Sequence, residues 1–110
     1  MQYLVTMEAL EDKIPTAGQD LVQHVEQVIA LGEALVALRK EGKILAGGMA
    51  VGRKANVFIA DAASNDELNL LLLSLPLFHI MEVDVTPLAD QEGVVKKVRQ
   101  NLERLKAAIG

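Results

Sequence analysis

The order in which two hydrophobic periods alternate along this chain is its most constraining feature. A period of two, typical of half-buried strands, occurs over residues 2–8 and 80–86, and residues 44–51 and 56–60, joined by a turn at 52–55, are predicted to form a β-hairpin. Three- and four-residue spacing, typical of amphipathic helices, occurs over residues 19–41, 64–75 and 89–108. The resulting order, β-α-β-β-α-β plus a helix, predicts a ferredoxin-like α+β fold with an antiparallel four-stranded sheet.

Turn and cap residues separate the predicted elements at the expected places. Pro15 precedes the first helix, where its missing N–H is tolerated, and Gly42 is placed to end that helix in a left-handed conformation. Ser64 and Glu67 have the spacing of a capping box at the start of the second helix. Pro76 ends that helix, because the residue before a proline disfavours the helical region.

Length and composition predict one domain that associates with itself. The 110 residues suit a single domain, with residues 1–88 as the core and 89–110 as a C-terminal helix. Hydrophobic residues make up 51% of the chain but aromatic ones only 3%, so the core must be largely aliphatic. So high an apolar share predicts that part of the surface is covered by a partner, and we expect a homodimer or a larger ring.

Charge and segment composition exclude several other classes of partner. The net charge of −4 provides no basic face for nucleic acid, and no polybasic membrane patch is present. The longest uncharged apolar run, residues 68–78, is too short to span a bilayer. No signal peptide is recognisable at the N-terminus, so a cytoplasmic location is the default expectation. The absence of cysteine excludes a disulfide and does not indicate a redox compartment.

The alternation within the strands predicts two faces of the sheet with different fates. One face carries Tyr3, Val5 and Met7 with Met81, Val83 and Val85, and it can supply the apolar surface that both long helices need. The last helix, with its continuous apolar stripe, could pack on its own chain or reach across to a neighbour. The other face, which includes Leu4 and Thr6, is then open and only partly polar. A second chain lying against this open face would leave a cavity between the two sheets, and this is where we expect a ligand pocket.

Few residues suggest chemistry by their spacing. Gly47, Gly48 and Gly52 lie between strands rather than between a strand and a helix, so a phosphate loop is not indicated. His24 and His79 are not spaced as metal ligands, and neither a metal site nor a cofactor is predicted. His24 lies four residues after Asp20, which favours a surface pair.

Three carboxylates share one face if the first and last strands pair: Glu8, Glu82 and Asp84. Such a group could raise one pKa and create a general base, which makes Glu8 and Glu82 weak catalytic candidates. The favoured interpretation is a solvated sheet edge, or an acidic rim that meets Lys43, Arg53 and Lys54 of another subunit. Ser74 has no histidine placed to activate it, so it is not expected to be a nucleophile.

The segments Ser74-Leu75-Pro76-Leu77-Phe78 and Met81 to Leu88 resemble the muconolactone isomerase family. Upstream, Lys40-Glu41-Gly42, the hairpin residues Gly52 and Ala55-Asn56, and Ser64 to Leu68 are also similar to that family, so about residues 31–88 are covered. The resemblance implies ferredoxin-like subunits that form dimeric α/β barrels and often larger rings. It also implies proton transfer beside the carbonyl of a small lactone acid.

Departures from the family pattern bear on the site. The family has a carboxylate on the inner face of the first helix, where this chain has Leu31, and larger residues where this chain has Ile44, Ala46 and Gly48. Together, the open sheet face and the resemblance predict a pocket lined by Leu4, Thr6, Leu31, Ala46, Asn56, Ser74 and Phe78.

The functional hypothesis is a muconolactone-isomerase-like homo-oligomer that binds a small apolar or weakly acidic molecule between sheets, its original chemistry lost or changed. One alternative is an active lactone isomerase that uses other acids, such as Glu8 or Glu82. A second alternative is a non-catalytic structural or interaction subunit. The antibiotic-biosynthesis-type monooxygenases share the dimer plan but lack the Leu-Pro-Leu-Phe segment, so they rank below these.

Overall fold

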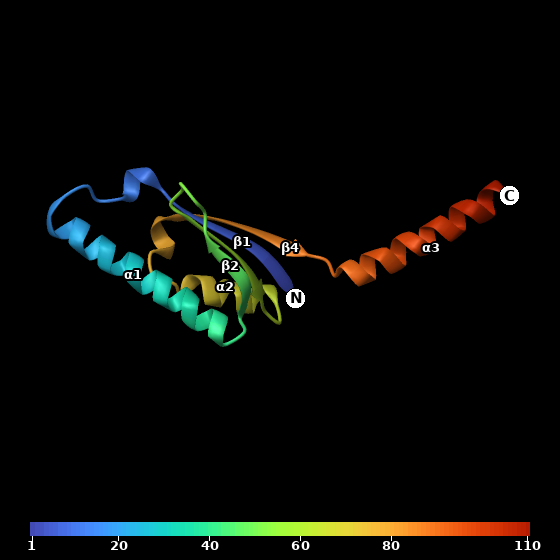
Figure 1. The fold of residues 1–110 in the computed structure, drawn as a ribbon, viewed down its shortest axis with the longest axis horizontal. Coiled ribbons are helices and arrows are strands. Elements are labelled where there is room, and N and C mark those ends of the chain that lie inside the picture. Colours follow the sequence, from blue (N-terminus) through green and yellow to red (C-terminus); the bar gives the residue numbers. More distant parts are fainter.

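A computed structural model describes residues 1–110 (Figure 1). The elements, in order, are β1 (Gln2–Ala9), the short helix η1 (Glu11–Lys13), α1 (Gly18–Lys40), β2 (Ile44–Met49), β3 (Ala55–Asp61), α2 (Asn65–Leu73), the short helix η2 (Phe78–Ile80), β4 (Met81–Leu88) and α3 (Gln91–Ile109). The strands form one antiparallel sheet in the order β2-β3-β1-β4. The predicted ferredoxin-like α+β fold is therefore confirmed.

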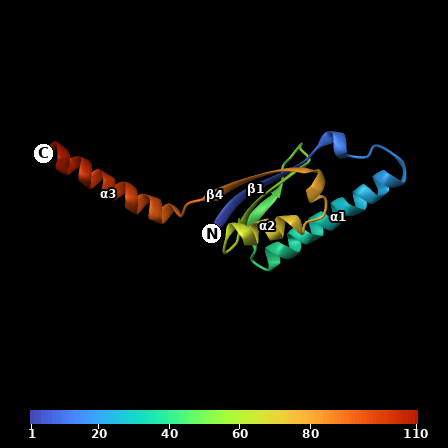
Figure 2. The same cartoon turned by 180° about the vertical axis from the view of Figure 1, so that it is seen from behind.

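The strand register gives each residue of β1 a face. Val5 lies opposite Phe58 of β3 and Val85 of β4, so these three side chains point to the same side of the sheet. That side is covered by α1 and α2 (Figures 1 and 2). The alternate residues Leu4 and Thr6 point to the other side, which no element of the chain covers. The predicted division of the sheet into a helix face and an open face is correct.

The helix ends follow the local signals. Gly42 has a φ of +80° directly after the C-cap of α1, the left-handed conformation predicted for it. The Ser64 hydroxyl accepts a hydrogen bond from the Glu67 N–H at 3.2 Å. The Glu67 carboxylate accepts one in return from the N–H of Ala63 at 2.8 Å, one residue earlier than in the usual capping box. The start of α2 is thus set by local sequence.

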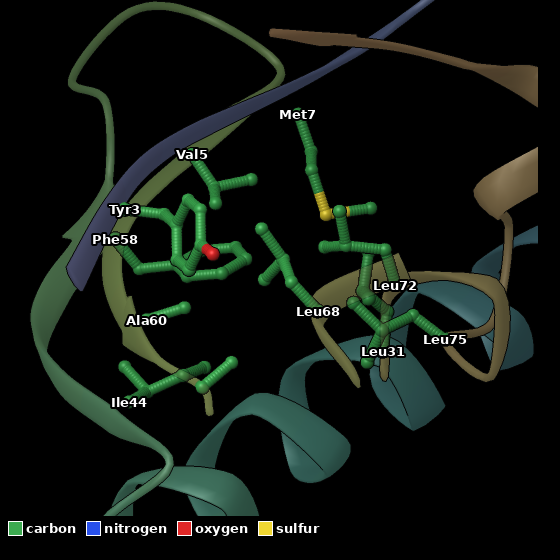
Figure 3. Close-up of a cluster of buried hydrophobic side chains, with 11 residues drawn as sticks. Tyr3, Val5, Met7, Leu31, Ile44, Phe58, Ala60, Leu68, Leu72 and Leu75 are labelled. Atoms are coloured by element: carbon green, nitrogen blue, oxygen red, sulfur yellow. The ribbon is translucent and has the colours of Figure 1, made fainter. Parts of the chain in front are cut away.

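The core lies between the sheet and the two helices that cover it (Figure 3). Its eleven buried side chains are Tyr3, Val5, Met7, Leu31, Ile44, Phe58, Ala60, Ala62, Leu68, Leu72 and Leu75. The Tyr3 hydroxyl donates a hydrogen bond to the Asn65 side-chain oxygen at 2.7 Å, which ties β1 to the start of α2. Apart from Tyr3 and Phe58 the core is aliphatic and Met7 fills its far end, as the composition predicts.

The last helix does not pack on its own sheet, which leaves contact with a neighbour as the other course that its apolar stripe allowed. Helix α3 buries none of its residues and projects beyond the end of β4 (Figures 1 and 2). The chain therefore extends over 74 Å in its longest dimension. Helices α1 and α2 lie on the helix face of the sheet, but Val85 near the end of β4 stays 40% exposed, and α3 points away from this face instead of covering it (Figure 1).

One helix, α1, is long and apolar enough to cross a membrane by length and composition alone. By itself this is weak evidence, because core helices of globular proteins meet the same criterion. In this structure, Leu31 and its neighbours on the inner face of α1 pack on the sheet.

Candidate functional site

A cavity of about 480 Å³ lies between α1 and the end of the sheet where the β2–β3 hairpin turns. This volume is within the range of sites for small molecules. Apolar side chains make up most of its wall, with three polar side chains among them. The lining residues are Ala9, Ile14, His24, Val28, Leu31, Gly32, Met49, Lys54, Asn56, Leu77 and Met81. This composition suits a largely apolar molecule that carries a few polar groups.

The fold brings the three polar residues of the cavity together from separate elements. His24 comes from α1 and lies two turns before Leu31, so both side chains are on the same face of the helix. Asn56 comes from β3, where it pairs with Met7 and therefore points to the helix side of the sheet. Lys54 ends the connection that leads into β3. The cavity thus combines an imidazole, an amide and an ammonium group.

The polar groups of His24 and Asn56 are available to a ligand. Neither side chain takes part in any of the hydrogen bonds that side chains form within the chain. Both residues are half-buried, so their surroundings are partly shielded from water. An imidazole can give or take a proton near neutral pH, and an amide can donate a hydrogen bond to a carbonyl oxygen.

Lys54 is already paired in the free protein. Its ammonium nitrogen lies 3.4 Å and 3.5 Å from the two carboxylate oxygens of Glu11 on η1. Both side chains are largely exposed, 59% for Lys54 and 79% for Glu11, so water and ions weaken this pair. An anionic ligand in the cavity would compete with Glu11 for the same ammonium group.

The wall of the cavity includes a residue in an unusual backbone conformation. Leu77 has a φ of +65°, the only non-glycine residue of the chain in the left-handed region. It follows Pro76, it is buried, and its side chain lines the cavity. Such conformations are costly for residues with a branched side chain and occur preferentially at functional sites. The Leu-Pro-Leu-Phe segment therefore shapes this cavity directly.

A smaller cavity of about 210 Å³ adjoins the first one and shares Gly32, Met49 and Asn56 with it. It lies between the C-terminal half of α1 and strands β2 and β3. Its cationic residue, Arg39, donates a hydrogen bond to the carbonyl oxygen of Gly47 at 3.5 Å. The two cavities therefore lie next to each other along α1.

The structure separates the residues that the sequence placed in one pocket. Leu4, Thr6 and Ala46 lie on the open face of the sheet, because Leu4 and Ala46 both pair with Ile59. Leu31 and Asn56 lie on the opposite side of the sheet, in the wall of the larger cavity. One set of side chains cannot line both places within a single subunit.

The two remaining predicted pocket residues line neither cavity. Ser74 is the exposed C-cap of α2, and its hydroxyl donates to the carbonyl oxygen of Leu71 at 2.6 Å, the local back-bond that competes with a ligand role. Phe78 is half-buried against the core cluster. Both belong to the connection that carries Leu77 into the cavity wall.

The predicted carboxylates are close to one another, but Glu8 is neutralised. Glu8 and Glu82 are direct neighbours across β1 and β4, as the pairing of the first and last strands implied. The Glu8 carboxylate forms a two-point ion pair with Arg53 of its own chain, including a contact of 3.4 Å from the Arg53 Nε. This hydrogen bond and charge raise the pKa of Arg53 above its ordinary value. Glu8 therefore has a cationic partner within its own subunit and does not need one from another subunit.

Sequence reasoning missed His24 and Lys54 as residues of a cavity. His24 was assigned to a surface pair with Asp20, but Asp20 takes part in none of the salt bridges of the chain. One signal was available, because His24 precedes the inward-facing Leu31 by seven residues and must share its face. The pairing of Lys54 with η1 carries no local signal.

Comparison with known proteins agrees with this fold and with the Leu-Pro-Leu-Phe segment. Residues 1–92 match the family model for muconolactone delta-isomerase. The muconolactone delta-isomerase of Cupriavidus pinatubonensis is 38% identical over 97 residues, covering 87% of this chain and 100% of that protein. Muconolactone delta-isomerase 1 of Acinetobacter lwoffii is 48% identical over 97 residues, covering 87% of this chain and 96% of that protein. The chain is a member of the muconolactone isomerase family.

Solved structures show the same fold. A crystal structure of muconolactone isomerase superposes with a TM-score of 0.70 and 26% identity, covering 83% of this chain and 91% of that one. A 5-chloro-2-hydroxyhydroquinone dehydrochlorinase from Burkholderia phenoliruptrix, in complex with 2,5-dihydroxybenzoquinone, superposes with a TM-score of 0.62 and 17% identity, covering 84% of this chain and 98% of that one. The second likeness extends to the fold alone.

Proposed function

We propose that this protein is a lactone isomerase that moves a proton on a small unsaturated lactone acid, with His24 as the group that carries the proton. One observation supports this above the others: His24, Lys54 and Asn56 meet in one largely apolar cavity of about 480 Å³. No carboxylate lines the cavity, so the proposal assigns the proton transfer to the imidazole of His24.

The reaction needs no oxidant and no cofactor. Moving a carbon–carbon double bond within a lactone requires one proton to leave one carbon and a proton to be added at another. In the proposal, the His24 imidazole removes the first proton and the resulting imidazolium returns one. Negative charge develops on the lactone carbonyl oxygen between the two steps, and the Asn56 amide donates a hydrogen bond to it.

Lys54 gives the proposed site its preference for an acid. A carboxylate on the substrate would bind the Lys54 ammonium at the mouth of the cavity in place of Glu11. The apolar wall, including Leu31 and Leu77, would contact the ring. Leu31 occupies the position at which the family resemblance implies a carboxylate, so proton transfer in this chain is assigned to His24 on the same helix face.

We further propose that the functional form is a homo-oligomer in the cytoplasm. The open face of the sheet carries Leu4 and Leu88, which are 37% and 38% exposed, together with half-buried Val57 and Ile59. A second sheet laid against this face would remove these apolar groups from water. The proposed substrate cavity lies on the other side of the sheet, so this contact would leave it accessible.

The experiment that tests the function is proton NMR of muconolactone in deuterated buffer, with and without the protein. Deuterium incorporated beside the carbonyl faster than in the protein-free sample is the expected result. If muconolactone binds, as saturation-transfer spectra would show, but gains no deuterium, the protein is a binding module and the isomerase assignment is wrong. If muconolactone neither binds nor exchanges, this ligand class is wrong as well.

The Glu11–Lys54 pair makes a separate prediction about affinity. Replacing Glu11 with Gln removes the carboxylate that competes for Lys54, so a carboxylate ligand should bind up to about fivefold more tightly, the value of an exposed ion pair. Asp12→Asn is the matched control, because Asp12 lies on the same short helix and pairs with no cation. Equal dissociation constants for the two variants in an NMR titration would contradict a role for Lys54 in ligand binding.

A further inference from the structure

Helix α3 carries an apolar stripe that nothing in its own chain covers. The stripe is formed by Val95, Val98, Leu102, Leu105 and Ile109, whose exposed fractions run from 47% to 88%. Their spacing of three, four, three and four residues is that of a coiled-coil seam. A helix with such a seam is stable when a second helix packs along it.

The outer face of α1 carries a second uncovered stripe of similar length. It consists of Val22, Val25, Ile29 and Val36, which are 48%, 48%, 57% and 55% exposed. The opposite face of α1 packs on the sheet through Leu31 and its neighbours, so this helix is apolar on both sides. An apolar stripe on each of two opposite faces of a helix favours a partner on each face.

The two stripes match in length and in charge. Each extends over about 21 Å of helix, from residue 22 to 36 and from 95 to 109. Arg99 and Lys106 follow one side of the α3 stripe, and Glu26 and Glu33 follow the corresponding side of the α1 stripe. Both charged pairs are exposed and have the same seven-residue separation, so the spacing of the cations equals that of the carboxylates.

The position of the charges selects the orientation of the helices. In both stripes the charged residues follow a seam residue by four positions, Arg99 after Val95 and Glu33 after Ile29. When two helices pack antiparallel, the residues that follow a seam residue by four positions on one helix lie beside the residues at the same position on the other helix. Antiparallel packing therefore brings Arg99 near Glu33 and Lys106 near Glu26.

We propose that α3 of one copy of this chain packs antiparallel on the outer face of α1 of a second copy. The contact is between copies, because α3 points away from the sheet and from α1 of its own chain (Figures 1 and 2). Most of α3 lies beyond residue 92, where the family match ends. Exchanged between two copies about a two-fold axis it closes a dimer, and repeated head to tail it forms a ring or a longer chain.

Charge reversal tests the contact without removing apolar groups. The double variant Arg99→Glu with Lys106→Glu should weaken self-association about tenfold in analytical ultracentrifugation, because two attractive pairs become repulsive. The matched control is Lys97→Glu with Arg104→Glu, which makes the same change of charge on the same helix. Residues 97 and 104 lie about 200° round the helix from the start of the seam, so the control should keep the association of the unmodified chain.

A second variant distinguishes contact between chains from contact within one chain. Glu26→Lys with Glu33→Lys reverses the α1 side and should also weaken association by itself. A mixture of the α1-reversed and the α3-reversed chains should associate again, because the reversed α3 meets the reversed α1 only on another molecule. Far-ultraviolet circular dichroism of each variant checks that the helices are retained.

Several results would overturn the proposal. One is a monomeric mass of the unmodified chain across the concentration series, which would mean that α3 folds back on its own α1 or that another partner covers it. Another is equal weakening by the control variant, which would report net charge rather than contact. The last is a mixture that associates no better than its components. All of these readouts are independent of any turnover.

Discussion

Replacing His24 with Gln is expected to reduce the rate of proton exchange on the lactone by about 10²- to 10⁴-fold, the usual contribution of a positioned acid–base group. Glutamine keeps a polar side chain of similar reach but cannot accept and return a proton. The measurement is the initial rate of deuterium incorporation into muconolactone by NMR, at saturating ligand. Binding should be nearly unchanged, because Lys54 and the apolar wall of the cavity remain.

The chain provides its own control for this experiment. His79→Gln makes the same change at the only other histidine, which is exposed on η2 and does not line either described cavity. This variant should exchange protons at the rate of the unmodified protein. If His24→Gln retains full activity as well, proton transfer is carried by another group, and Glu82, which forms no salt bridge, becomes the residue to test.

Gly47→Ala is expected to lower the free energy of unfolding by about 3 kcal/mol, a large effect for one methyl group. Gly47 has a φ of +150°, which side-chain-bearing residues rarely adopt. An added Cβ would lie 2.5 Å from the Val57 carbonyl oxygen and 2.6 Å from the Phe58 Cβ, so strands β2 and β3 would have to separate. Urea denaturation at a fixed protein concentration measures the change, since association also contributes to stability.

The neighbouring glycine is the matched control. Gly48→Ala adds the same methyl group to the same strand, but nothing lies within 4 Å of its Cβ position and its φ is not in the left-handed region. Its free energy of unfolding should stay within about 0.5 kcal/mol of that of the unmodified protein. Similar midpoints for the two variants would show that β2 relaxes freely away from Phe58.

The reliability of sequence reasoning followed the range of the interactions involved. The cap at Ser64 and the left-handed Gly42 depend on contacts within four residues, and both are present as predicted. The faces of β1 were correct because alternation is a property of the strand itself. The Leu-Pro-Leu-Phe resemblance led to the right family, since the family match includes that segment.

The site was harder to predict because its residues are distant in the sequence and come together only through tertiary packing. Ala46 and Leu31 were placed in one pocket, yet the sheet separates them. His24 and Lys54 are thirty positions apart, and no local pattern says that α1 crosses the sheet near the end of the hairpin that holds Lys54. Which side of the sheet provides a cavity depends on where α1 and α2 leave a gap.

By itself, the sequence determined the order of the elements, their ends and the apolar face of each one, because hydrophobic period and cap chemistry are local properties. The tertiary structure alone decided which of these faces meet. It placed α1 and α2 on the sheet, left α3 uncovered, and brought an imidazole, an ammonium group and an amide to one cavity. The physical reason is that the hydrophobic effect has no direction: it requires an apolar stripe to be buried, but the geometry of the whole chain selects the surface that buries it.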